Sequence, residues 1–285
     1  MNATRDNAPP VGLIAGQGPL PVIVADSMRK AGKQVCCVGL SGQFAPELRE
    51  HCDRFRSVGL LRPGQWIRTL RRWDVSEAVM IGRVSKRRMH DPFRLFRTIP
   101  DVRALTLWYR RLRHDKRTPA LLAALADELG ASGVTLIDST TYIQDQMATA
   151  GPMTKARPTH EQEADIEFAW PILNEALRLQ IGQAIAVRER DVIAVEAVEG
   201  TTRMIERAGQ LCRRHGWTLL KSAPVDQDRR ADVPTIGEQT IRAMKDAGGG
   251  CIALGVGDVI IADKEGTLRL ADELGIAIVG LPRPT

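Results

Sequence analysis

Short apolar segments alternate with amphipathic segments along most of the chain. The run VGLIAG at 11–16 predicts a buried strand, VIVADSMRKAG at 22–32 predicts a helix, and KQVCCVGL at 33–40 predicts a second strand. A strand, a helix and a strand in this order are typical of a parallel crossover unit. The chain is therefore expected to begin with a doubly wound sheet.

The same alternation continues to about residue 145. The later segments of this half predict strands at 55–60, 77–84 and 134–140, and helices at 64–75 and 118–133. We therefore expect residues 1–145 to form a Rossmann-like α/β domain.

The second half has a different pattern. A polar connection containing Pro152 and Pro158 follows the first domain, and we place the domain boundary there. Two apolar segments then flank the polar turn RERD at 188–191, which predicts a hairpin, and helical and strand-like segments alternate to the end. Residues 146–285 are expected to form a second α/β domain with a mixed sheet, in which Thr201 or Thr202 caps a helix.

Composition narrows the class of protein. The 285 residues are 44% hydrophobic and 26% charged, which is typical of a soluble chain with a sizeable core. The net charge of +6 favours acidic partners: phosphates, nucleotides, nucleic acid or an anionic membrane face. No secretory signal and no apolar run of ~20 residues is found, so we expect a cytoplasmic protein, soluble or peripheral to a membrane.

The five cysteines lack the spacing of zinc ligands, and two of them, Cys36 and Cys37, lie within an apolar run. We expect buried free thiols and no structural zinc. The motifs G-x-S-x-G and HExxH are absent as well, so no covalent nucleophile is predicted.

A glycine turn, GLIAGQGPLP at 12–21, follows the first predicted strand. The dinucleotide pattern G-x-G-x-x-G is broken after Gly18, and no acidic residue ends the second strand, which argues against NAD. A tight structural turn is one interpretation. Because ligands bind at the carboxyl ends of such strands and helix N-termini favour anions, we expect a substrate cleft instead. Its predicted lining is Gly16, Gln17, Gly18, Pro19 and Leu20.

Residues 83–117 hold twelve Lys or Arg against three Asp, interleaved with four aromatic residues. Such a segment could hold nucleic acid through phosphate contacts and stacking, or rest on an anionic membrane. A solvated basic face is the simpler alternative. Arg83, at its start, is a candidate phosphate contact.

Carboxylates gather after two predicted strands of the second half. The stretch DQDRRADVPTIG at 226–237 carries Asp226, Asp228 and Asp232, and AVEAVEGTT at 194–202 carries Glu196 and Glu199. Mg²⁺ prefers one or two carboxylates completed by water and substrate phosphate. These five residues are therefore candidate metal ligands, although an exposed loop and a capping role for Glu199 would also explain the pattern. The cations that could neutralise a phosphoryl group are Lys221, Arg229 and Arg230.

Seven segments together resemble a known family. GLIAGQGPLP, VMIGRV, IGQAIAV, VIAVEAVEGT, LLKSA, QDRRADVPTIG and ADELGIAIVG occur in this order. The chain resembles the UDP-2,3-diacylglucosamine diphosphatases of the lipid A pathway, in the form unrelated to calcineurin-like metallophosphoesterases. It departs from that family's usual pattern at Thr202, which follows EGT in place of an aspartate, and at Pro224, in place of a lysine.

The resemblance implies two α/β domains that close around UDP-2,3-diacylglucosamine and hydrolyse it to UMP and 2,3-diacylglucosamine 1-phosphate (lipid X). It further implies Mg²⁺ as cofactor, a homodimer, and peripheral association with the inner membrane. Water would attack the phosphorus on the sugar side. The expected catalytic residues are Asp228, Asp232 and Glu199, with Gln183, Thr201, Lys221 and Arg230 as additional substrate contacts. A glycosyltransferase acting on the same nucleotide lipid, and a non-enzymatic nucleic-acid-binding protein, are the alternative functions.

Overall fold

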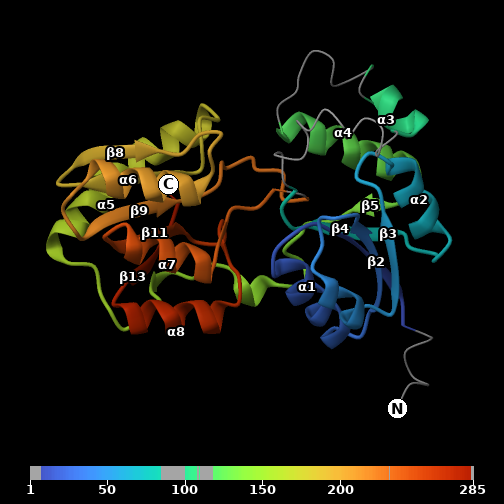
Figure 1. The fold of residues 1–285 in the computed structure, drawn as a ribbon, viewed down its shortest axis with the longest axis horizontal. Coiled ribbons are helices and arrows are strands. Elements are labelled where there is room, and N and C mark those ends of the chain that lie inside the picture. The colour runs from blue at the N-terminus through green and yellow to red at the C-terminus, as the bar shows by residue number, and fades with distance from the viewer. Residues whose placement is uncertain (1–7, 85–99, 108, 110–117, 231, 284–285) are drawn as a thin grey trace. The chain divides into compact units, whose positions relative to one another are not determined.

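The fold is that of a computed structural model, which describes residues 8–84, 100–107, 109, 118–230 and 232–283 (Figure 1). The chain divides into two units. The first unit contains residues Met1–Gln144 together with Asp228–Asp232, and the second contains Asp145–Gln227 and Val233–Thr285. The division at Gln144 lies beside the boundary expected at residue 145, but the short acidic segment groups with the first unit.

The first unit is built on a parallel five-stranded sheet in the order β3-β2-β1-β4-β5. This order is that of a Rossmann-like domain, which confirms the predicted fold class. Its strands are β1 (Pro10–Ala15), β2 (Gln34–Leu40), β3 (Arg54–Val58), β4 (Glu77–Ile81) and β5 (Thr135–Leu136). Its helices are α1 (Leu20–Lys30), η1 (Pro46–His51), α2 (Pro63–Arg71), α3 (Val102–Leu107) and α4 (Thr118–Ala131).

Strand β2 explains why this sheet needs helices on both faces. All seven of its residues are buried, as expected for a parallel strand with no face toward water. Ile14, Cys36 and Val38 pack with Trp66 of α2 and Leu129 of α4 in one apolar cluster, while α1 packs against β1 and β2. The helices therefore shield both faces of the sheet.

The second unit is built on a mixed six-stranded sheet in the order β6-β13-β11-β9-β7-β8. Strands β9, β11 and β13 are parallel, whereas β7 and β8 form the antiparallel hairpin predicted around RERD. The strands of this unit are β6 (Gly151–Pro152), β7 (Ala184–Arg188), β8 (Asp191–Val195), β9 (Trp217–Lys221), β10 (Thr235–Ile236), β11 (Gly249–Gly255), β12 (Ile260–Ile261) and β13 (Ala277–Leu281). The helices are η5 (Gln144–Gln146, which begins at the last residue of the first unit), α5 (His160–Arg178), α6 (Thr201–Leu211), α7 (Glu238–Asp246) and α8 (Lys264–Leu274).

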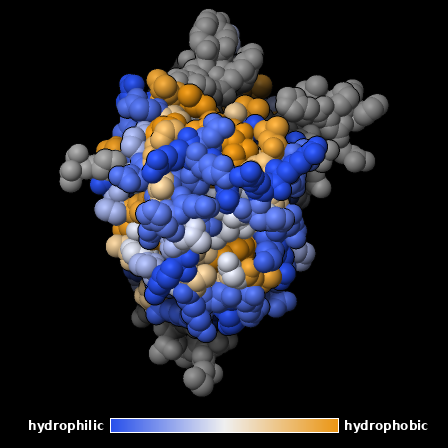
Figure 2. Space-filling view, turned by 90° about the vertical axis from the view of Figure 1, so that its left-hand side faces the viewer, coloured by the Kyte–Doolittle hydropathy of each residue, from blue (hydrophilic) through white to orange (hydrophobic). Residues whose placement is uncertain are grey.

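Two apolar clusters cover this mixed sheet. One joins Leu173 of α5 to Leu220 and Ala253 of the sheet, and the other joins Met204 of α6 and Met244 of α7 to it. The face drawn in Figure 2 is mostly hydrophilic, with hydrophobic groups in separate patches. This distribution suits a domain whose helices turn their polar sides to water.

Two local expectations differ from the structure. Helix α6 begins at Thr201, and its N-cap is Gly200, with no side-chain cap. The expected cap by Thr201 or Thr202 is therefore wrong, because the Thr201 hydroxyl donates to Glu196 at 2.9 Å instead. Helix α3 was not predicted, because four of its five described side chains are exposed and it shows no apolar stripe.

The cysteines lead to a prediction about thiol reactivity. All five are free; burial raises the pKa of Cys36 to about 11 and that of Cys251 to about 12, and the pKa of Cys37 is also raised by burial. Because the thiolate is the reactive form, these three should resist iodoacetamide in the native protein, whereas half-buried Cys212 and Cys52 should react first. Peptide mapping after labelling tests this, with urea-unfolded protein as the control in which all five react. Rapid native labelling of Cys36 or Cys251 would contradict the described core.

Candidate functional site

The glycine turn after β1 is tied to the segment after β4. Gln17 and Arg83 exchange two main-chain hydrogen bonds of 2.8 and 2.9 Å, and the Gly16 amide donates to Ile81. The contact needs two glycines, because a Cβ on Gly82 would lie 2.8 Å from the Gly16 carbonyl carbon, and Gly82 has a φ of +99°. Strands β1 and β4 flank the switch point of the sheet, so the structure brings the predicted turn and Arg83 together at the expected ligand-binding edge.

The N-terminus of α1 offers fewer free donors than the sequence suggested. Pro19 and Pro21 have no amide hydrogen, and the amides of Val22 and Ile23 both donate to the Pro19 carbonyl. An anion at this helix end would depend mainly on the amide of Leu20 and on nearby cations. Gly18 and Pro19 are exposed, as is the side chain of Arg83, so the turn remains open to a ligand.

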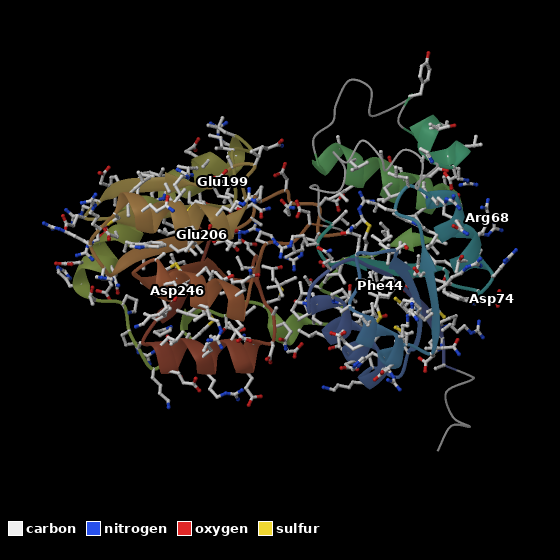
Figure 3. The ribbon with its side chains drawn as sticks, viewed as in Figure 1. Phe44, Arg68, Asp74, Glu199, Glu206 and Asp246 are labelled. Carbon is white, nitrogen blue, oxygen red and sulfur yellow. The ribbon has the colours of Figure 1, made fainter. Side chains whose placement is uncertain are left out.

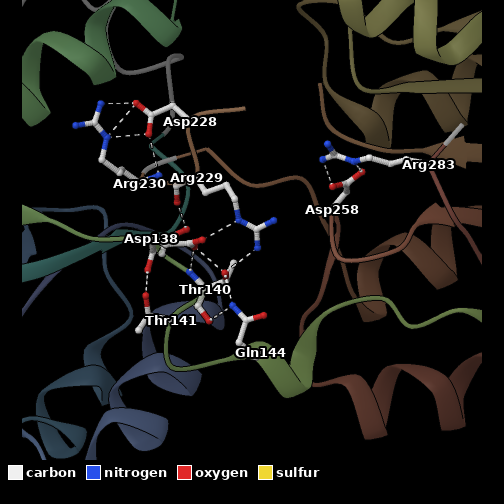
Figure 4. A network of polar contacts seen from close by, with 10 residues as sticks. Asp138, Thr140, Thr141, Gln144, Asp228, Arg229, Arg230, Asp258 and Arg283 are labelled. Carbon is white, nitrogen blue, oxygen red and sulfur yellow. Dashed lines mark hydrogen bonds and ion pairs between the residues drawn. The ribbon is translucent and has the colours of Figure 1, made fainter. Parts of the chain in front are cut away.

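The acidic loop, residues 226–232, contains an internal ion pair. The Asp228 carboxylate accepts from Arg230 through its main-chain amide at 3.1 Å, through Nε at 2.9 Å and through Nη2 at 2.6 Å (Figure 4). The hydrogen bond from Arg230 lowers the pKa of Asp228 and keeps it ionised. Both side chains are about 40% exposed, at 42% and 38%, so water or a ligand can reach the pair. Asp226 is exposed and Asp232 is half-buried.

Glu196 lies in a buried polar cluster of the second unit. Its Oε2 atom is 3.3 Å from Lys221 Nζ, and its Oε1 atom accepts from the Thr201 hydroxyl at 2.9 Å. Lys221 Nζ also donates to Thr201 Oγ1 at 2.8 Å. Glu196, Thr201 and Lys221, predicted separately as metal and substrate ligands, are therefore partners of one another.

Glu199 lies three residues further on, in the turn just before α6 (Figure 3). Its Oε1 atom accepts from Arg207 at 2.7 Å, and its Oε2 atom accepts from the Ala197 amide at 3.1 Å. The pKa of Glu199 is lowered, first by a hydrogen bond from its own main chain and then by Arg207. In this structure Glu199 stabilises the turn before α6, which resembles the capping role that the sequence offered as an alternative to metal binding.

Sequence reasoning missed a second buried polar cluster, in which Asp258 supplies the carboxylate. Its carboxylate is buried and accepts from the Ser222 hydroxyl at 3.0 Å. It also accepts from Arg283 Nε at 2.9 Å (Figure 4). Arg283 also donates to the Val225 carbonyl at 3.3 Å, just before the acidic loop, and the Ser222 amide donates to the Gln183 carbonyl. No local pattern could have shown this cluster, because Asp258 and Ser222 are 36 residues apart.

The candidate metal ligands fall into separate groups. Asp228 and Asp232 belong to the first unit, and Glu196, Glu199 and Asp226 belong to the second. Among the residues that the structure describes, no three His, Cys, Asp or Glu side chains are gathered closely enough to hold a metal. Mg²⁺ can use a single accessible carboxylate completed by water and phosphate oxygens, and the ionised, partly exposed carboxylate of Asp228 fits that requirement.

Most of the basic aromatic segment lies outside the described residues, including Phe93, Phe96 and Trp108. Among the described residues of this segment, Val102, Leu105 and Tyr109 are exposed. In the described part of the chain, no helix is both long enough and apolar enough to cross a bilayer.

Both halves of the chain match models of one protein family. Residues 10–146 match the LpxI N-terminal domain, and residues 149–279 match the LpxI C-terminal domain. The chain is also 31% identical over 281 residues to the UDP-2,3-diacylglucosamine pyrophosphatase LpxI of Caulobacter vibrioides, an alignment that covers 95% of this chain and 97% of the relative. These matches, over both α/β units in the same order, show that the chain belongs to the LpxI family.

Proposed function

We propose that this protein hydrolyses the pyrophosphate bond of UDP-2,3-diacylglucosamine, giving UMP and 2,3-diacylglucosamine 1-phosphate for lipid A biosynthesis. The observation that carries this proposal is the near full-length similarity to the Caulobacter vibrioides pyrophosphatase, together with the match of both LpxI domains. The structure adds a ligand-accessible pair, Asp228 and Arg230, within a segment that the family resemblance singled out.

The reaction requires water, charge neutralisation and no covalent intermediate. The oxygen of water forms a bond to the phosphorus on the sugar side, the bond from that phosphorus to the bridging oxygen breaks, and the bridging oxygen leaves with UMP. With UMP and lipid X both written as phosphate dianions, the two products and the two protons of the water account for all atoms. A bound Mg²⁺ would supply positive charge to the phosphate oxygens in this displacement.

Asp228 and Arg230 can serve this chemistry by exchanging partners. As a pair they neutralise each other; with substrate and Mg²⁺ present, the Asp228 carboxylate would hold the cation and the Arg230 guanidinium would bind a phosphate oxygen. The pair is half-exposed, so separating it carries a small electrostatic cost. Asp232 lies four residues from Asp228 in the same loop and is proposed as a second ligand.

The other predicted residues receive more limited roles in this proposal. The exposed Gly18, Pro19 and Arg83 would contact the nucleotide or phosphates. Lys221, Thr201 and Glu196 would support the turn before α6, because their polar atoms already bond to one another. Glu199 and Asp226 remain proposed metal ligands, and Gln183 a proposed substrate contact.

We further propose that the protein works in the cytoplasm at the inner-membrane surface, as a homodimer. The substrate carries two acyl chains, which favours an enzyme that visits membranes. The net charge of +6 and the exposed Val102, Leu105 and Tyr109 within the basic segment support this location.

Product analysis in ¹⁸O-labelled water tests the proposed reaction. UDP-2,3-diacylglucosamine, Mg²⁺ and purified protein should yield UMP and lipid X in equal amounts, with the ¹⁸O label in the phosphate of lipid X. Label in UMP would move the attack to the other phosphorus. Release of UDP with a disaccharide product would instead establish a glycosyltransferase, and salt-dependent oligonucleotide binding without turnover would establish a nucleic-acid-binding protein.

A further inference from the structure

Arg229, between Asp228 and Arg230, is held by residues from a distant part of the sequence. Its Nε atom donates to Asp138 Oδ2 at 2.8 Å, and its Nη2 atom donates to Thr140 Oγ1 at 2.9 Å (Figure 4). Asp138 and Thr140 follow β5 in the first unit, about ninety residues earlier in the chain. The acidic loop is therefore attached to the first unit through its central residue.

Asp138 and Thr140, the two acceptors that follow β5, are themselves held in place by hydrogen bonds. Asp138 Oδ1 accepts from the Thr140 amide at 2.7 Å and from the Thr140 hydroxyl at 2.6 Å. The Thr140 hydroxyl has given its one hydrogen to Asp138, so its lone pairs are free to accept from Arg229 and from Gln144 Nε2, at 2.9 Å each. The hydroxyl thus donates one hydrogen bond and accepts two, and these three bonds determine its orientation.

The main chain of Arg229 is held at the same place. Its carbonyl accepts from the Ser139 amide at 2.9 Å and from the Ser139 hydroxyl at 2.8 Å. Ser139 and Thr140 are almost fully buried, so these bonds form on a rigid support rather than on a surface loop. Side chain and main chain together restrict both the position and the direction of residue 229.

We propose that Asp138 and Thr140 are positioning residues for the pyrophosphatase reaction, which seat the acidic loop on the first unit by binding Arg229. The inference rests on the proposed function of that loop. Asp228 and Arg230 are bonded directly to Arg229, so holding its side chain and its carbonyl restricts where these two neighbours can lie. The chain leaves the second unit at Gln227 and returns to it at Val233, so these contacts hold a segment whose described residues belong to no strand or helix.

The rate of tryptic cleavage after Arg230 measures directly how firmly the loop is held on the first unit, and it does not depend on pyrophosphatase activity. In Asp138→Asn the loop should open more often and the bond after Arg230 should be cut about tenfold faster, the loss expected for one charge-assisted hydrogen bond. The kcat for UDP-2,3-diacylglucosamine should fall by about the same factor with KM little changed, because the loop is misplaced for chemistry rather than lost for binding. Arg229→Gln should behave alike, and the double variant should be no worse than either single one.

Asp145→Asn is the matched control. Asp145 is an exposed carboxylate seven residues after Asp138 that pairs with its neighbour Gln146, so its loss should change neither cleavage nor kcat. Unchanged cleavage in both Asp138→Asn and Arg229→Gln would overturn the proposal, and so would a fall in kcat with no faster cleavage. An inactive wild-type protein whose Asp138→Asn variant is still cut faster would remove the proposed function and retain the seating of the loop. If Asp138→Asn does not fold, Arg229→Gln alone decides, since that side chain is partly exposed.

Discussion

Replacing Lys221 with methionine should lower the free energy of unfolding of the second unit by about 3–5 kcal/mol, the usual cost of breaking a buried ion pair from one side. The side chains of Lys221 and Glu196 are only 3% and 11% exposed. Methionine fills a similar volume but leaves the Glu196 carboxylate without its cation, in a place that water hardly reaches. The effect should therefore come from the uncompensated charge rather than from lost packing.

Hydrogen exchange of the amides in β9 and α6 measures this loss locally, which suits a chain of two units that need not unfold together. The double variant Lys221→Met/Glu196→Gln should recover much of the stability, because no charge is left unpaired. Arg178→Met is the control, since Arg178 and Glu175 form an exposed i,i+3 pair whose loss should change the stability very little. A single variant as stable as that control would show that the cluster around Glu196 is open to water.

The elements of the fold were predictable because their signals are local. The apolar run of β2, the glycine that ends the first helix and the polar turn RERD each lie within a few residues, and the structure has the expected elements at those places. Elements without such a signal were missed: α3 has no apolar stripe, and β10 has only two residues. The parallel order of the sheet followed from the alternation of strands and helices.

The candidate site was less predictable, because its partners are distant in sequence. The letters DQDRRAD suggest one set of carboxylates and two free cations, yet Arg230 pairs within the loop and Arg229 pairs with Asp138, 91 residues away. Glu196 likewise pairs with Lys221, which is 25 residues away in the sequence. A sequence shows which charges are present, but only the fold decides which of them neutralise one another, and the carboxylates that remain accessible are fewer than those counted.

Accessibility and charge thus favour Asp228 over Glu196 and Glu199 among the five predicted carboxylates. Glu196 is buried against a lysine and Glu199 is bound by Arg207 and main-chain amides. Among the described residues, the ion-pair partner of Asp228 is Arg230, and that partner is itself suited to phosphate. The pair is therefore the place where loss of one carboxylate should affect the reaction most.

Asp228→Asn should lower kcat/KM for UDP-2,3-diacylglucosamine by about 10²–10³-fold, which corresponds to the several kcal/mol that a bound cation contributes to charge stabilisation. Asparagine retains the size of the side chain and one acceptor oxygen, so the fold should be kept. The lowered pKa of Asp228 means that the wild-type carboxylate is already ionised at neutral pH, and raising the pH should not restore the variant. Steady-state assays at saturating Mg²⁺, across neutral and alkaline pH, measure this loss.

Mg²⁺ binding to Asp228 has a second readout that does not depend on turnover. A ligand that binds only the folded protein raises the unfolding midpoint, so Mg²⁺ should stabilise the wild-type protein and have little effect on Asp228→Asn. Glu238→Gln is the matched control, because Glu238 also pairs with an arginine, Arg242, on an exposed helix and should leave both activity and the Mg²⁺ effect intact. Equal Mg²⁺ stabilisation in Asp228→Asn would place the cation elsewhere, whereas loss of activity with normal Mg²⁺ binding would leave Asp228 a role in orienting Arg230 or water. If Asp228 exchanges Arg230 for Mg²⁺ when substrate binds, Asp228→Asn should lose both the activity and the Mg²⁺ stabilisation.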